Sequence, residues 1–192
     1  MILNTLKQFN WLDIVIILIL VRICFVALKT GFPIEIFKLL GSIFAILVAL
    51  HYYSRISEFI TGRFSITVAP IEFMDFLIFI LLVASAYSLF ILLRISILNM
   101  VKIEAVSLLN KWGGLALGIL RAVLTASLLC YILAICSVSY FPKSIKNSYF
   151  GYSLFKVSPG IYNAIWGSVV SKFSSTDRLN PQVKQTQEAI SR

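Results

Sequence analysis

Four long apolar runs dominate the chain, and polar breaks separate them. The runs cover residues 12–28, 32–53, 73–93 and 112–140. A helix of about 20 residues crosses the ~30 Å hydrocarbon core of a bilayer, so each run suits one membrane crossing. Apolar and polar residues do not alternate with a period of two, which argues against a membrane β-barrel. The pattern therefore predicts four transmembrane helices.

The breaks between the runs determine how these helices connect. The first break is residues 29–31, the second is 54–71 and the third is 95–111. Connections of this length join neighbouring antiparallel helices. We therefore predict an all-α polytopic membrane protein, in which residues 1–157 form a four-helix transmembrane bundle.

The segment after the fourth run has a different pattern. Ser158 and Pro159 suit the start of a helix, with the serine as N-cap. Apolar residues then recur at spacings of three and four, forming a stripe of Ile161, Tyr162, Ile165, Trp166, Val169 and Phe173. A helix of about 14 residues is too short to cross the membrane. Residues 158–173 are expected either to form an amphipathic helix in the membrane interface or to pack on the rim of the bundle.

The last part of the chain, residues 174–192, is polar. It contains Pro181, three glutamines and no aromatic residue. A segment with so few large apolar side chains buries too little surface to offset the entropy lost on ordering. The composition therefore predicts a disordered tail.

The overall composition indicates that lipid is the solvent for most of the chain. Hydrophobic residues make up 59% of the 192 residues, charged residues make up 13%, and the mean hydropathy is +0.93. A soluble domain carries about 25% charged residues. The net charge of +9 arises mostly from the breaks and the tail, which is typical of membrane topology. We expect the lipid bilayer and other membrane proteins, or a second copy of the chain, as partners, and no nucleic acid.

Small residues recur every four positions in two of the runs. The fourth run carries Gly114, Gly118, Ala122 and Ala126, and the second run carries Gly41, Ala45 and Ala49. Residues four apart lie on one helix face. Small side chains on one face let two helix backbones approach closely inside a membrane. We therefore predict that these two faces are helix-packing surfaces.

Arg121 lies in the fourth run, with no charge in residues 122–138. An arginine at mid-helix costs roughly 2.5–3.5 kcal/mol when it faces lipid, so its side chain is expected to turn inward. Glu35, near the start of the second run, lies at a similar depth, whereas Asp13 enters from the opposite side of the membrane. We predict a buried charge pair of Arg121 and Glu35. The pair either fixes the helices together or lines a path for a solute or a proton.

The sequence offers no motif for catalysis or for cofactor binding. It lacks a Gly-x-Ser-x-Gly elbow, a phosphate-binding glycine loop and the spacing of a metal site. His51 follows the apolar part of the second run beside two tyrosines, which indicates an aromatic-rich helix end at the membrane interface. The three cysteines, Cys24, Cys130 and Cys136, lie in apolar segments and are expected to act as small hydrophobic residues. We expect no enzyme activity, no metal and no cofactor.

Two blocks of the sequence carry residues that resemble a known family motif. The first block begins with Asn-Trp-Leu-Asp-Ile-Val at residues 10–15, and the second begins with Leu-Leu-Asn-Lys at residues 108–111. The residues that match the family motif are Asp13, Gly31, Glu35, Gly41, Gly118 and Arg121. Together the two blocks resemble the CvpA family, the colicin V production proteins of bacterial inner membranes, over roughly residues 10–160. The resemblance implies a four-span protein of the inner membrane.

The chain departs from the family pattern at three positions. Asn110 stands where an aspartate is usual, Pro33 where a basic or apolar residue is more common, and Arg22 where a small or apolar residue is usual. The family has no agreed active site, so the resemblance assigns no catalytic residue.

The resemblance also implies a role and an orientation. Members of the family are associated with colicin production or export and with envelope integrity. Some relatives fuse the same four spans to an extracytoplasmic serine protease, which implies that both termini lie outside the cytoplasm. Lysines and arginines nearly balance between the two sides of the predicted bundle, so the positive-inside rule does not decide the orientation.

Two classes of function are compatible with these features. The first is a membrane scaffold or accessory subunit that supports toxin export or envelope homeostasis. The second is a small transporter or channel subunit in which Arg121 and Glu35 line a polar path. A water-filled cavity that reaches Arg121 would favour transport, and a dry, fully paired charge would favour the scaffold.

Overall fold

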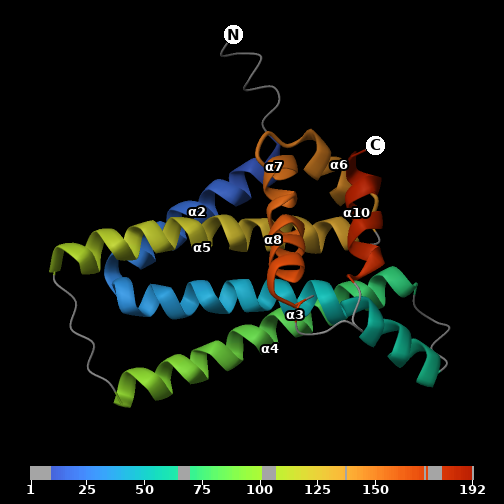
Figure 1. Ribbon diagram of the computed structural model, residues 1–192. Helices are drawn as coiled ribbons and strands as arrows, with labels where there is room; N and C mark the ends of the chain where they lie inside the picture. Colours follow the sequence, from blue (N-terminus) through green and yellow to red (C-terminus); the bar gives the residue numbers. More distant parts are fainter. Residues whose placement is uncertain are drawn as a thin grey trace, which may run out of the picture.

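The computed structural model describes residues 10–64, 70–100, 107–136, 138–170, 172 and 179–191. Four long helices contain the apolar runs, namely α2 (Trp11–Thr30), α3 (Phe32–Phe64), α4 (Ile71–Met100) and α5 (Ser107–Ile135) (Figure 1). Each of them is long and apolar enough to cross a membrane. No strand occurs in these described ranges. The prediction of an all-α polytopic membrane protein is confirmed.

The four long helices form a row with α3 and α5 at its centre. The extensive contacts are those of α3 with α4 and with α5, and those of α2 with α5. Contacts of α2 with α3 and of α4 with α5 are sparse. Figure 1 shows that α4 diverges from α3 toward the end of α4. Large parts of the outer helices α2 and α4 therefore keep an exposed apolar surface.

Several helix ends differ from the boundaries that the apolar runs predict, most of all the end of α3. α3 continues through residues 54–63, which the pattern assigns to a polar break. This extension stays helical because it is packed: Ser57 is fully buried, and Ile56 and Ile60 lie against the hydrophobic core. By contrast, α5 ends at Ile135, five residues before the predicted end of the fourth run.

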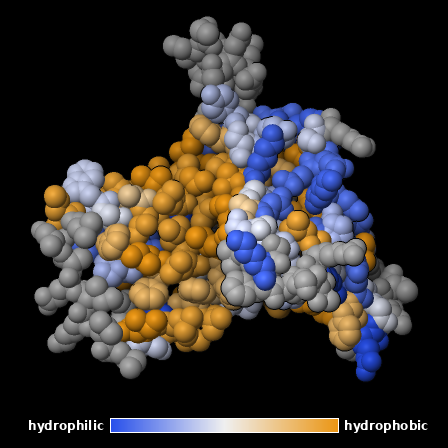
Figure 2. Space-filling view, in the orientation of Figure 1, coloured by the Kyte–Doolittle hydropathy of each residue, from blue (hydrophilic) through white to orange (hydrophobic). Residues whose placement is uncertain are grey.

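The C-terminal part of the chain folds over one end of the bundle. It consists of α6 (Tyr140–Asn147), α7 (Gly151–Phe155), α8 (Val157–Ile165), the π-helical turn η1 (Trp166–Val170) and α10 (Pro181–Ser191). We call these elements the C-terminal cap. They lie where α2 begins and α5 ends (Figure 1), and the hydrophilic surface in Figure 2 gathers over this end of the molecule. The opposite part of the bundle has an apolar surface in the same view.

α8 packs across α3 and α5 instead of presenting its whole apolar stripe to lipid. Tyr162 is completely buried and Trp166 is nearly so. Of the two arrangements that the sequence allows, packing on the rim of the bundle describes these two residues. Ser158 is not the N-cap, because it lies inside the helix, where its N–H donates to Ser127 Oγ of α5 at 2.7 Å. Residues 173–178 lie outside the described part of the chain.

α10 corrects the prediction of a disordered tail. Val183 and Ile190 are seven residues apart on one helix face, and both are buried. Asn180, just before the helix, donates from Nδ2 to the backbone oxygen of Leu50 in α3 at 2.8 Å. Two apolar side chains and one amide hold this helix because the bundle supplies the surface that covers them. A polar composition alone gives no sign of that surface.

The small residues of α5 face α2. A Cβ added at Gly118 would overlap the Cβ of Ala27, and a Cβ at Gly114 would lie 3.0 Å from the backbone carbonyl carbon of Gly31. The two alanines of this ladder, Ala122 and Ala126, are fully buried. The α2 and α5 backbones therefore approach each other closely, as small residues allow inside membranes.

The small residues of α3 form a second close contact. A Cβ at Gly41 would lie 3.0 Å from the Cβ of Phe90 in α4, and Ala45 and Ala49 are completely buried. Each outer helix thus packs against a central helix that carries small residues.

We predict that Gly118→Leu destabilises the protein far more than Leu120→Ala. A leucine at position 118 would push α2 away from α5, and overpacking of a filled interface costs about 1–3 kcal/mol or more. The Leu120 side chain is 56% exposed, so its truncation removes mostly lipid-facing surface. Thermal unfolding of the purified variants in detergent measures both effects. Equal melting temperatures would place Gly118 outside the α2–α5 interface.

Candidate functional site

A tight turn between α2 and α3 positions the residues of the site. Gly31 has a φ of 79°, a left-handed conformation that glycine adopts without strain. The N–H of Phe32 donates to Asn110 Oδ1 of α5 at 2.9 Å. A neutral amide at position 110 therefore caps the start of α3. The turn brings the end of α2 close to the first turn of α3.

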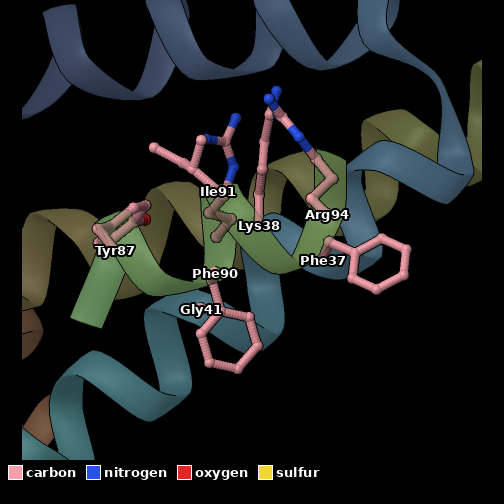
Figure 3. A pocket seen from close by; sticks show the side chains of 8 residues that line it. Phe37, Lys38, Gly41, Tyr87, Phe90, Ile91 and Arg94 are labelled. Carbon is pink, nitrogen blue, oxygen red and sulfur yellow. The ribbon is translucent and has the colours of Figure 1, made fainter. Parts of the chain in front are cut away.

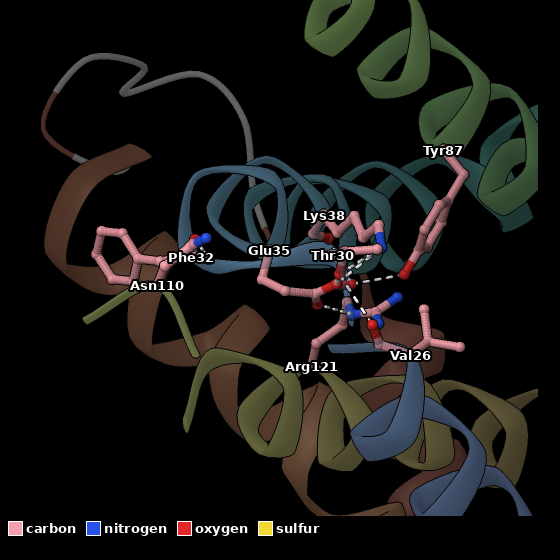
Figure 4. Close-up of polar contacts among 9 residues, drawn as sticks. Val26, Thr30, Phe32, Glu35, Lys38, Tyr87, Asn110 and Arg121 are labelled. Atoms are coloured by element: carbon pink, nitrogen blue, oxygen red, sulfur yellow. Dashed lines mark hydrogen bonds and ion pairs between the residues drawn. The ribbon is translucent and has the colours of Figure 1, made fainter. Parts of the chain in front are cut away.

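The Glu35 side chain is completely buried, and groups from three helices surround its carboxylate (Figure 4). Arg121 Nε of α5 lies 2.9 Å from Oε2, and Lys38 Nζ of α3 lies 2.7 Å from Oε1. Thr30 Oγ1 of α2 donates to Oε1 at 2.5 Å. We call Thr30, Glu35, Lys38 and Arg121 the charge cluster. The structure thus brings together the two residues that the sequence pairs, and it adds a second cation and a hydroxyl.

Arg121 is buried, but its hydrogen-bonding capacity is not used up. The Nε–Oε2 contact with Glu35 is short, yet it lacks the alignment of a hydrogen bond. The buried Nη2 has no hydrogen-bond partner among the described residues. A guanidinium carries five N–H donors in a rigid fork. Two cations share one carboxylate here, so the cluster has a net charge of +1 and a free donor.

Two cavities adjoin Arg121. The first has a volume of about 150 Å³ and is lined by Phe37, Lys38, Gly41, Tyr87, Phe90, Ile91, Arg94 and Arg121 (Figure 3). The second has a volume of about 320 Å³ and is lined by Ile19, Ile23 and Val26, together with Arg22, Arg121 and Thr125. Both combine apolar walls with cationic groups, so an anion or water is the chemistry that they suit.

Asp13 lies at the opposite end of α2, far from the charge cluster along the helix. Its fully buried carboxylate accepts hydrogen bonds from Ser148 Oγ at 2.6 Å and from the N–H groups of Phe150 and Tyr149 at 3.0 and 3.3 Å. The N–H of Asn10 donates to it at 2.9 Å. Asp13 therefore attaches the start of α2 to the C-terminal cap and is not a partner of Arg121.

His51 lies beneath α8 and not at an open aromatic-rich helix end. It is buried, its Nδ1 is 3.0 Å from Tyr162 Oη, and its ring stacks on Trp166 with a centroid distance of 4.2 Å. All three cysteines are free thiols. Within the described ranges, no group of three or more histidine, cysteine, aspartate or glutamate side chains is placed to hold a metal ion.

Sequence reasoning missed part of the charge cluster. Lys38 and Glu35 are three residues apart, which places them on neighbouring positions of one helix face. That spacing is visible in the sequence, but a lysine near a helix end can equally extend toward water. Thr30 carries no such signal, because its contact with Glu35 depends on the chain reversal at Gly31.

Fold and site together define a polytopic helical membrane protein whose central helices enclose a buried, cation-rich charge cluster. The family model described as Colicin V production protein matches residues 12–159, so the chain belongs to this family. No curated protein and no solved structure matches the chain.

We predict that Glu35→Leu costs more stability than Arg121→Leu. Without Arg121, the Glu35 carboxylate keeps Lys38 and Thr30. Without Glu35, two neighbouring cations lose their shared anion. Removal of one partner from a buried pair costs about 3–5 kcal/mol when the other charge is left alone, so only the Glu35 variant should approach that range.

Thermal unfolding in detergent tests this order. Glu72→Leu is the control, since it removes an exposed carboxylate from the first turn of α4 and should change the melting temperature little. A larger loss for Arg121→Leu than for Glu35→Leu would mean that Lys38 and Thr30 do not stabilise the carboxylate.

Proposed function

We propose that the chain is a membrane scaffold or accessory subunit of the bacterial inner (plasma) membrane. In this role it supports the production or export of a colicin V type toxin and the homeostasis of the envelope. Two observations support the proposal: the match to the colicin V production protein family and the four helices that suit a membrane.

The observation that carries the scaffold role is the burial of Glu35 within groups from three helices. Charges in this arrangement fix the relative positions of α2, α3 and α5. A rigid centre of this kind leaves the outer helices to contact other molecules. On α2 an exposed apolar stripe runs through Ile14, Leu18, Val21 and Phe25. Its spacing of four, three and four residues suits packing against another membrane helix or lipid.

We also propose that this role is non-catalytic. The groups of the charge cluster contact one another, and the sequence carries no motif of an activated nucleophile beside them. The partners that fit are lipids, other membrane proteins and a second copy of the chain.

A small transporter or channel subunit is the second candidate. A cavity that reaches Arg121 favours transport over a scaffold, and two cavities adjoin Arg121 here. A guanidinium with an unused donor can bind an anion or water. In this candidate function, Arg121 and Glu35 line a polar path through the bundle.

We predict that the double variant Glu35→Leu with Arg121→Leu separates the two functions. Removal of both charges should recover stability relative to Glu35→Leu, because only Lys38 is left unpaired and its 17% exposed side chain reaches the surface. A scaffold should then also regain toxin export and envelope integrity in a complemented deletion strain.

Activity that stays lost while stability and expression recover would support the transport function instead. If deletion of the gene changes neither toxin export nor envelope integrity, the scaffold proposal is wrong.

We also propose that both termini lie outside the cytoplasm, an orientation that rests on the likeness to relatives with an extracytoplasmic protease. An alkaline phosphatase domain fused after residue 192 is then expected to be active, since that enzyme requires an oxidising compartment. A cytoplasmic reporter fused at the same place should be inactive. The reverse result would place both termini in the cytoplasm.

A further inference from the structure

The cavity between α3 and α4 has an excess of positive charge. Lys38, Arg94 and Arg121 line it, and Glu35 is the carboxylate that contacts two of these cations. Arg94 has no ion-pair or hydrogen-bond partner within the described ranges. Figure 3 shows the Lys38 and Arg94 side chains extending toward the same part of the cavity. Among the described residues, three cations and one buried acid leave this site short of anionic charge.

The remaining wall of the cavity is apolar, apart from one hydroxyl. Phe90 and Ile91 of α4 line it, and Ile91 is 45% exposed on the outer surface of the bundle. The Tyr87 hydroxyl lies 2.6 Å from Ser42 Oγ. Because α4 contacts α5 only sparsely, the cavity adjoins a surface that lipid covers in a membrane. A ligand with an anionic head and apolar chains matches both parts of this environment.

The depth of the cations also fits a lipid headgroup. Lys38 is six residues from the start of α3, and Arg94 is six residues from the end of α4. At 1.5 Å per residue, both lie about 9 Å inside the helix ends on the same side of the bundle. At this depth both cations belong to one leaflet's half of a ~30 Å hydrocarbon core. Their long side chains can extend from there toward the headgroups of that leaflet.

We propose that this cavity binds the phosphate group of an anionic membrane phospholipid. Basic pockets between transmembrane helices suit such headgroups. Arg94 supplies N–H donors, Lys38 and Arg121 add positive charge, and the acyl chains lie along the exposed surface near Ile91. The proposal goes beyond the scaffold role and holds whether or not the protein supports toxin export.

Native mass spectrometry of the full chain in detergent, titrated with phosphatidylglycerol or phosphatidylethanolamine of the same chain length, tests the proposal. We expect one phosphatidylglycerol to bind more tightly than phosphatidylethanolamine. Arg94→Gln should weaken its binding about five-fold, the effect of one basic residue near an anionic lipid. Lys111→Gln is the matched control: it removes an exposed cation from the same end of the bundle, outside the cavity, and should leave the affinity unchanged. Arg94→Lys keeps the charge and should bind phosphatidylglycerol like the unchanged protein. It therefore shows whether weaker binding of Arg94→Gln comes from the lost charge.

Three results would overturn the proposal. Equal binding of both lipids would exclude recognition of an anionic headgroup. Equal weakening by Arg94→Gln and Lys111→Gln would indicate attraction to the whole basic surface and not to the cavity. Displacement of phosphatidylglycerol by millimolar inorganic phosphate or sn-glycerol 3-phosphate would assign the site to a free phosphate compound instead of a lipid.

Discussion

The burial of the Glu35 carboxylate is the constraint on which the arrangement of the membrane helices depends. A carboxylate in a low-dielectric interior is strongly destabilising unless opposite charge and hydrogen-bond donors surround it. Here those groups come from the end of α2, the first turns of α3 and the middle of α5. Each helix must therefore hold one rotation and one depth, since a shift by a single residue would remove a contact from the carboxylate.

Close backbone packing makes this arrangement possible. The contact of Gly118 with Ala27 brings α5 and α2 together, so that Arg121, three residues further along α5, can reach the carboxylate at the α2–α3 turn. At its other end, α2 is fixed by a second buried carboxylate, Asp13, through hydrogen bonds to the C-terminal cap. One carboxylate is balanced mainly by cations and the other by N–H and hydroxyl groups. That difference leaves excess positive charge from the described residues next to the cavities at the Glu35 end of the bundle.

The central and outer helices have different roles in this arrangement. α3 and α5 carry the small-residue ladders and the ion-paired charges of the cluster, whereas α2 and α4 expose apolar stripes. In water such stripes would drive aggregation, but in a bilayer they are the surface that lipids or neighbouring membrane helices cover. The excess positive charge near α4 suits an anionic lipid next to this helix. The same helix therefore combines an apolar contact surface with an arginine that has no acidic partner among the described residues.

The sequence by itself determined the four spans, the small-residue surfaces and the partnership of Arg121 with Glu35. Span length and the cost of a charge in hydrocarbon depend on the local sequence. The inward orientation of Arg121 and its pairing with an acid at the same depth could therefore be predicted. Only the tertiary structure decided that Thr30 and Lys38 complete the cluster, that His51 lies under α8, and that the polar tail contains the helix α10. These features depend on surfaces supplied by distant parts of the chain. Asp13, for example, contacts groups more than a hundred residues away. A short amphipathic helix is stable only where such a surface covers its few apolar side chains, and no local pattern reveals that surface.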